Sequence, residues 1–181
     1  KATKILRISE KEVLSLKIRK QSIDARKKPN IMYVYTVDVE VSNEQKIMRR
    51  QKGNQVTLIH ETPYDFPNSG TKKMEHRPVV IGSGPAGLFC AYLLAEHGYR
   101  PVVYERGASV EERKKDVERF WNEQILNPNS NVQFGEGGAG TFSDGKLNTL
   151  VKDPSGRNRK VLEIFVKEGA PEEILYVNKP H

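Results

Sequence analysis

The chain has 181 residues and a formal net charge of +7, with 29% charged residues, 14 glycines and 10 prolines. This length fits one domain or two small ones, and the composition excludes collagen-like, low-complexity and wholly disordered chains. The longest apolar run, residues 86–95, is about half of the roughly 20 residues that a membrane helix needs, which excludes a membrane span. The N-terminus has no secretory signal, and Cys90 is the single cysteine, so we expect a cytoplasmic protein without disulfides.

The excess positive charge lies in the first part of the chain. Residues 1–75 contain 16 Lys and Arg against 9 Asp and Glu, whereas residues 76–181 contain 14 of each. Such asymmetry indicates two units with different surfaces. Residues 63–76 gather Pro, Asn, Ser and Gly, which is typical of a linker. We therefore predict a small basic α+β domain over 1–62, a linker over 63–76, and a Rossmann-like domain over 77–181 that is truncated at its C-terminus.

The basic domain is predicted to have the element order β-α-β-α-β. The expected elements are a strand over 5–8, a helix after the capping box of Ser9 and Glu12, a strand over 31–41, a helix over 43–51 and a strand over 56–59. The clustered Lys and Arg residues are compatible with phosphate binding, and Tyr33 and Tyr35 could stack bases. A solvated basic surface is the more common role of such clusters, and no base-reading motif accompanies them.

Residues 79–98 carry the most informative motif in the chain. The β-branched strand 79–81 runs into Gly82-Ser83-Gly84-Pro85-Ala86-Gly87, a GxGxxG segment, and then into a helix that ends before Gly98. Gly82 allows the tight turn, Gly84 lets the backbone approach a pyrophosphate, and Gly87 lets the helix pack close to the strand. The helix N-terminus directs its N–H groups at the phosphates. The pattern predicts a dinucleotide-binding βαβ unit.

A carboxylate follows at the position where this unit needs one. The strand 101–105 ends in Glu105, 18 residues after Gly87. A glutamate there accepts hydrogen bonds from both ribose hydroxyls of an adenosine and repels a 2′-phosphate, which disfavours NADP.

A second glycine cluster follows a charged helix. The helix is predicted from a capping box of Ser109 and Glu112 to about Gln124, with an apolar stripe that we interpret as core: Val117, Phe120, Trp121 and Ile125. The cluster at residues 135–148 strips side chains from the backbone and allows close approach to a flat or charged ligand. Thr141, Ser143 and Lys146 add donors to it; a merely flexible loop is the alternative.

With both glycine segments in view, the chain resembles the bacterial FAD-dependent dehydrogenases described as NAD(FAD)-utilising dehydrogenases, within the two-dinucleotide-binding flavoproteins. The matching segments are 79–88, 105–107 (Glu105-Arg106-Gly107) and 134–147, and the last is the specific one. The likeness extends to residues 22–28. Members of this family are much longer, so we expect the chain to be an N-terminal fragment.

The resemblance implies noncovalent FAD, with NAD(H) as a possible redox partner, and a partial FAD-binding βαβ unit of α/β class preceded by the α+β domain. The implied cofactor-binding residues are Gly82, Ser83, Gly84, Pro85, Ala86, Gly87, Glu105, Arg106, Gly137, Gly138, Ala139, Thr141, Ser143 and Lys146. The implied function is a FAD-dependent oxidoreductase of unknown substrate, for which this chain supplies the ADP-binding half of the FAD site. The alternative is a dinucleotide- or nucleic-acid-binding module without turnover of its own.

Other reactive residues give weaker indications. Cys90 has no partner for dithiol–disulfide chemistry, and the four histidines lack metal-ligand spacing. Asp144 and Lys146 are candidates for proton transfer or for tuning a flavin, although stabilising the loop is the more common role of such residues. We predict no metal site and assign no catalytic residue.

Overall fold

The structure, a computed structural model, describes residues 1–51, 53–147, 149 and 152–177. The chain divides into two compact units, residues 1–67 with 146–181, and residues 68–145. The division at 67/68 lies within the predicted linker. Residues 146–181 group with the N-terminal unit, whereas the sequence places them in a domain over 77–181; that extent stays a prediction.

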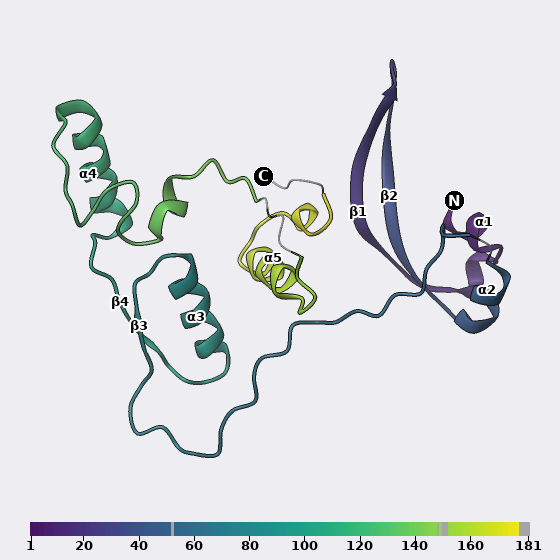
Figure 1. Cartoon of the computed structure of the whole chain (residues 1–181), viewed down its shortest axis with the longest axis horizontal. Helices are drawn as coiled ribbons and strands as arrows, with labels where there is room; N and C mark the ends of the chain where they lie inside the picture. Colours follow the sequence, from purple (N-terminus) through teal and green to yellow (C-terminus); the bar gives the residue numbers. More distant parts are fainter. Residues whose placement is uncertain (52, 148, 150–151, 178–181) are drawn as a thin grey trace. The chain divides into compact units, whose positions relative to one another are not determined.

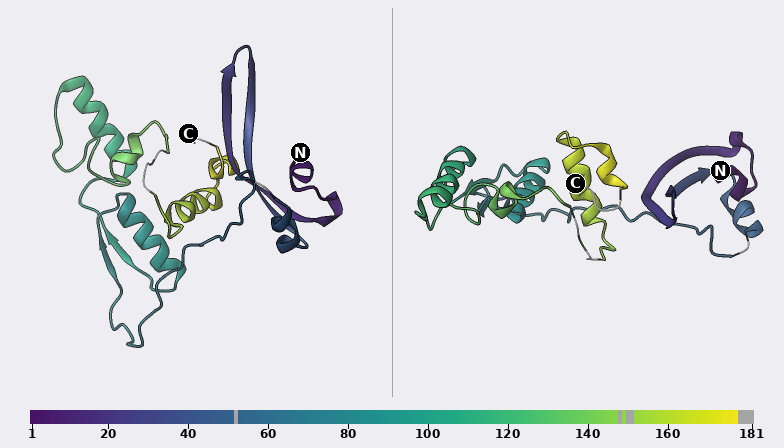
Figure 2. Two further views of the ribbon diagram at one scale, coloured as in Figure 1. Left: turned by 45° about the vertical axis from the view of Figure 1, so that its right-hand side comes forward. Right: turned by 90° about the horizontal axis from the view of Figure 1, so that it is seen from above.

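The first unit is built on a long hairpin, which Figures 1 and 2 show extending beyond the short helices at its base. Its elements are α1 (Ala2–Leu6), the 3-10 turn η1 (Glu10–Glu12), β1 (Val13–Lys27), β2 (Asn30–Val41), α2 (Glu44–Arg50), α5 (Arg157–Lys167) and the 3-10 turn η3 (Glu172–Leu175). β1 and β2 are antiparallel. Gln21 of β1 also donates its N–H to the carbonyl of Tyr176 at 2.7 Å, which joins the last described segment to the hairpin.

Three of the elements predicted for this unit are wrong. Residues 5–8 are not a strand: α1 covers Ala2–Leu6 and ends where Arg7 adopts a left-handed φ of 55°. The capping box of Ser9 and Glu12 forms, but it caps only η1, and β1 begins at Val13. The alternating apolar side chains after Val13 favour a strand over a helix, although Leu14 and Leu16 stay 62% and 54% exposed. Residues 56–59 form no strand, so the order β-α-β-α-β is also wrong.

The predicted strand over 31–41 and the predicted helix over 43–51 are confirmed as β2 and α2. Asn43 caps α2 by accepting the N–H of Lys46 at 3.3 Å. At the base of the hairpin, Val41 packs with Leu6 and Ile47 in a small buried core. This core explains the position of α2, because its one buried residue, Ile47, meets the end of β2 there.

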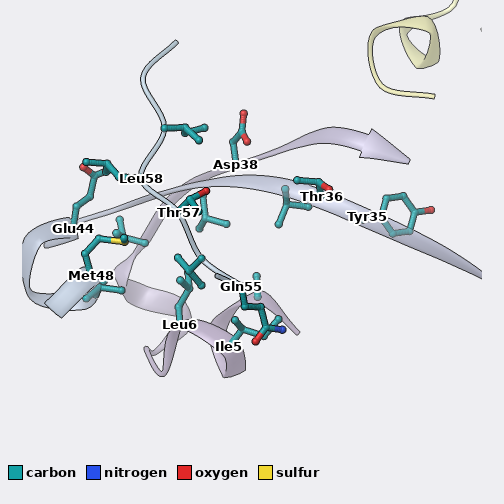
Figure 3. Close-up of a pocket in the computed structure, with 17 residues that line it drawn as sticks. Ile5, Leu6, Tyr35, Thr36, Asp38, Glu44, Met48, Gln55, Thr57 and Leu58 are labelled. Carbon is teal, nitrogen blue, oxygen red and sulfur yellow. The ribbon is translucent and has the colours of Figure 1, made fainter. Parts of the chain in front are cut away.

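A cavity of about 350 Å³ opens beside this core. Its walls come from α1, β2, α2 and residues 55–59 (Figure 3). In Figure 3 the carboxylate of Asp38 points away from Ile5 and Leu6; it lies 3.8 Å from the guanidinium of Arg19 instead. Apolar and polar groups both line the cavity, among them Ile5, Leu6, Gln55 and Thr57.

The second unit contains the predicted βαβ arrangement. Its elements are β3 (Val79–Ile81), α3 (Pro85–Glu96), β4 (Val102–Tyr104), α4 (Val110–Glu123) and the 3-10 turn η2 (Gly138–Phe142). β3 and β4 pair in parallel, and α3 packs against both strands (Figure 1). This confirms a mixed α/β fold with a partial βαβ unit. The predicted end at Gly98 is also correct, since Gly98 follows the helix with a φ of 81°.

Helix α4 differs from its prediction in two features: the group that caps its N-terminus and the burial of its apolar side chains. Its limits agree, but no side-chain hydrogen bond from Ser109 caps it. The Val110 N–H is instead bound by the carboxylate of Glu136, at 2.8 Å, so the second glycine segment supplies this contact. Val117 is buried, as predicted, whereas Trp121 is 65% exposed, because nothing in the described part of the chain packs over its outer side. The interpretation of the whole stripe as core is therefore wrong in this structure.

Candidate functional site

The first glycine segment forms the turn between β3 and α3. Gly82 has a φ of 93°, in the left-handed region that favours glycine, and its N–H donates to the carbonyl of Tyr104 at 2.7 Å. Gly84 is the N-cap of α3, and Pro85 occupies the first turn. A helix leaves the N–H groups of its first turn without intrahelical acceptors, and it has a partial positive charge at this end. The turn thus presents an N-terminus suited to an anion.

The three glycines of this segment have the geometry that their spacing predicts. A Cβ atom on Gly87 would overlap the carbonyl oxygen of Gly82, so only glycine lets α3 lie this close to the turn. A Cβ atom on Gly84 would meet its nearest atom, the Cα of Gly138, at 4.0 Å. Gly87 is therefore required by packing, whereas a Cβ atom on Gly84 would be accommodated in ordinary van der Waals contact with Gly138.

Glu105 lies beside this turn. Its carboxylate accepts the Ser83 N–H at 2.7 Å, the Ser83 hydroxyl at 3.0 Å and the Gly107 N–H at 2.8 Å. These hydrogen bonds, with the Ser83 and Gly107 N–H groups first, hold the pKa of Glu105 below its ordinary value of 4.5. The carboxylate is therefore ionised at neutral pH, and it joins the end of β4 to the first glycine segment.

Replacing Glu105 tests this connection. Glu105→Gln is expected to lower the free energy of unfolding by about 1–3 kcal/mol at neutral pH, because an amide nitrogen would face an N–H donor. Since folding lowers the pKa of this carboxyl group, its contribution is complete above the ordinary value of 4.5 and is lost as the pH falls through the lowered pKa. The acid limb of stability against pH should therefore be shallower in Glu105→Gln.

Urea unfolding followed by the fluorescence of Trp121, the single tryptophan, measures this effect at each pH. Glu118→Gln, which changes an exposed glutamate of α4, is the control and should keep the wild-type stability at neutral pH. Equal stability of the Glu105 variant and the wild type would refute a structural role for this carboxylate.

The second glycine segment, defined here as residues 135–142, lies directly against the first. The Gly137 N–H donates to the Ser83 carbonyl at 3.0 Å. A Cβ atom on Gly138 would come within 3.1 Å of the Cα of Gly84 and 3.2 Å of the Cδ of Pro85. Gly137 and Gly138 both have a positive φ, of 82° and 64°. Two segments about 50 residues apart in the sequence thus meet at the N-terminus of α3.

Arg113 of α4 supports the second segment from behind, and the sequence analysis missed it. Its side chain is fully buried. The guanidinium donates to the carbonyl oxygens of Asn131, Val132 and Glu136 at 2.7, 2.9 and 2.7 Å. One signal was available, since Arg113 stands four residues before the buried Val117 and so lies on the same face of the helix.

The other predicted residues have varied environments. Ser83 is buried, whereas Pro85, Ala86 and Ala139 are exposed. The Arg106 guanidinium lies 5.4 Å from the centre of the Phe134 ring. Two predicted donors take part in local hydrogen bonds, since the hydroxyl of Thr141 donates to the Glu136 carbonyl and that of Ser143 accepts the Gly145 N–H.

Lys146 belongs to the other unit. The binding roles of all these residues stay predictions. Cys90 is exposed. In the described ranges, no three or more His, Cys, Asp or Glu side chains gather as metal ligands, and none of the helices there has the length and apolarity to cross a membrane.

Comparisons with known proteins bear on the same segment. Residues 80–111, which contain the turn, α3, β4 and Glu105, match the model of an NAD(P)-binding Rossmann-like domain. Residues 1–40 match a domain of unknown function. The chain is 46% identical, over all 181 residues, to an uncharacterized protein of Clostridium beijerinckii, of which it covers 34%. It is also 34% identical over 74 residues, or 41% of the chain, to the thiamine thiazole synthase of Sulfolobus acidocaldarius, of which that match covers 24%.

The chain spans about a third of the longer Clostridium relative. The Rossmann-like match coincides with the parallel β3–α3–β4 arrangement and with the glycine turn at its carboxyl edge. Comparison and geometry therefore agree that the ligand class of this segment is a dinucleotide.

Proposed function

We propose that this chain binds the ADP portion of FAD in a FAD-dependent oxidoreductase whose substrate is unknown. The observation that carries the proposal is the meeting of the two glycine segments at the N-terminus of α3, beside the ionised Glu105. The first segment and the helix N-terminus suit a diphosphate. Glu105 suits the hydroxyls of the adenosine ribose. Bound FAD would supply hydride transfer, with NAD(H) as the candidate redox partner.

The residues present fit such a group. Gly84 has no neighbour closer than 4.0 Å to a Cβ position, so the backbone can approach a diphosphate. Gly138 extends the side-chain-free surface beyond Gly84. NADP is the less suitable dinucleotide, because the negative charge of Glu105 would repel a 2′-phosphate. The second glycine segment favours FAD over NAD, since it widens this surface beyond the diphosphate, where the flavin would extend.

Titration of the purified protein with FAD, FMN, NAD and NADP tests the proposal. Flavin fluorescence reports the two flavins, and calorimetry reports all four ligands. We expect FAD to bind more tightly than FMN, because only FAD carries the adenosine diphosphate that the turn and Glu105 would hold, and we expect NADP to bind most weakly. Equal binding of FAD and FMN would overturn the assignment.

The alternative function is nucleic-acid binding by the basic first unit. In that case the purified protein would retain RNA and no flavin. Several of its cations already form ion pairs, including Arg19 with Glu61 at 3.1 Å and Arg26 with Asp24 at 2.7 Å. The paired carboxylates partly neutralise the positive charge that these residues would offer to a phosphate.

Oxidoreductase activity belongs to the longer protein. The full-length Clostridium beijerinckii relative should retain flavin on purification, and anaerobic NADH should bleach the flavin absorption if a nicotinamide is the donor. Flavin that stays oxidised with NADH, and is reduced only by dithionite, would remove NAD(H) from the proposal and leave FAD binding in place.

A further inference from the structure

Arg113 has an unusual environment for a cation. The side chain has no exposed surface, and none of the ion pairs among the described residues includes it. Its hydrogen-bond acceptors are neutral: three backbone carbonyls and the hydroxyl of Thr141, at 3.2 Å. Burying a charge costs free energy unless hydrogen bonds compensate. An apolar residue would avoid this cost, so burial alone does not explain an arginine here.

The acceptors show what the guanidinium organises. The carbonyls of Asn131 and Val132 lie four and three residues before the second glycine segment, while Glu136 and Thr141 belong to it. The guanidinium also lies 4.9 Å from the centre of the Phe142 ring. A Cβ atom on Gly135 would come within 2.6 Å of the Arg113 Cδ, so the segment rests directly on this side chain. One side chain thus holds both ends of the segment.

The middle of the segment is oriented by the same contact. In a trans peptide unit the C=O and the following N–H point in opposite directions. Since the Glu136 carbonyl is bound by Arg113, the Gly137 N–H must point the other way, and it donates to the Ser83 carbonyl at 3.0 Å. The hydrogen bond behind the segment therefore fixes the face that it turns to the first glycine segment.

We propose that Arg113 is a positioning residue that holds the second glycine segment against the N-terminus of α3, so that the part of FAD beyond the ADP meets a preformed backbone surface. This inference rests on the proposed function. Arg113 acts through the segment and is not assigned contact with the ligand. Lysine cannot replace it, because an ammonium group lacks the planar fork that reaches acceptors on several sides.

The test compares the affinities of FAD and ADP in the wild type and in Arg113→Lys. The first segment and Glu105 are unchanged in this variant, so ADP should bind with nearly wild-type affinity. FAD affinity should fall about tenfold, because the second segment is no longer held in one conformation. The readout is thus the ratio of the two affinities, which a general loss of stability would not change.

Arg119→Lys, an exposed arginine of the same helix that pairs with Glu123, is the matched control and should leave the ratio unchanged. If Arg113→Lys does not fold, Phe142→Leu removes only the ring that the guanidinium contacts and should lower the ratio less. An equal loss for ADP and FAD, or no loss for either, would overturn the role of Arg113. Failure of the wild type to bind FAD would refute the proposed function instead.

Discussion

Gly84→Val is expected to abolish measurable FAD binding. The valine side chain would project from the N-cap of α3 into the space where we place the diphosphate. Loss of about two charge-assisted hydrogen bonds from the helix N-terminus, at about 1.5–3 kcal/mol each, lowers affinity by a factor of roughly 100 or more. The backbone accepts a Cβ atom here, since the nearest atom to it, the Cα of Gly138, is 4.0 Å away and the φ of Gly84 is −70°, but the γ-methyl groups of valine extend further and will press on this neighbour.

Flavin fluorescence during titration with FAD measures this effect, and urea unfolding establishes that the variant is folded. Gly70→Val is the control in the same unit, since no atom lies within 4 Å of a Cβ atom there. It should bind FAD as the wild type does. A folded Gly84→Val protein with wild-type affinity would show that the ligand does not approach this turn.

The β3–α3–β4 unit could be predicted because its determinants are local. A strand, three glycines at fixed spacing and a closing glycine define the turn and the helix within 20 residues, and Glu105 follows at the end of the next strand. Each residue type has one main physical reason to occupy its position. The sequence therefore predicted the turn, its close packing at Gly87 and the position of Glu105 beside it.

The support of the second glycine segment could not be predicted in the same way. Its contacts join residues that are far apart in sequence, such as Arg113 with Glu136 and Ser83 with Gly137. The one local sign that Arg113 is buried is its position four residues before Val117, and this spacing does not show which residues it contacts. The capping of α4 by Glu136 has the same origin, because a distant carboxylate replaces the local capping box.

In the first unit, two local sequence patterns predict different structures for the residues after Ser9: a capping box predicts a helix, and alternating apolar residues predict a strand. The capping box of Ser9 and Glu12 is present, yet the alternation of apolar residues after Val13 determines the structure beyond η1. The strand pattern extends over 15 residues and its backbone groups pair with β2, so the longer pattern prevails over the cap. Short signals of four residues, such as residues 5–8, do not separate a helix from a strand.

Gly87→Ala should destabilise the second unit. The added methyl group would overlap the carbonyl oxygen of Gly82. Because this neighbour is backbone, no rotamer change can relieve the overlap, and α3 must move away from the turn. We expect a cost of about 3 kcal/mol, at the upper end of the range for overpacked cores. Alanine is favoured over glycine in a helix by up to about 1 kcal/mol, so the net loss is about 2 kcal/mol.

Urea unfolding followed by Trp121 fluorescence reports this unit specifically, since the only tryptophan lies in α4. Gly84→Ala adds the same methyl group three residues earlier, where the nearest atom is at 4.0 Å, and should unfold close to the wild-type urea concentration. Comparing Gly87→Ala with Gly84→Ala distinguishes a glycine that packing requires from a glycine at which packing allows a side chain. If both variants unfold like the wild type, then α3 does not need the close contact with Gly82, and the packing explanation of the third glycine fails even if FAD binds.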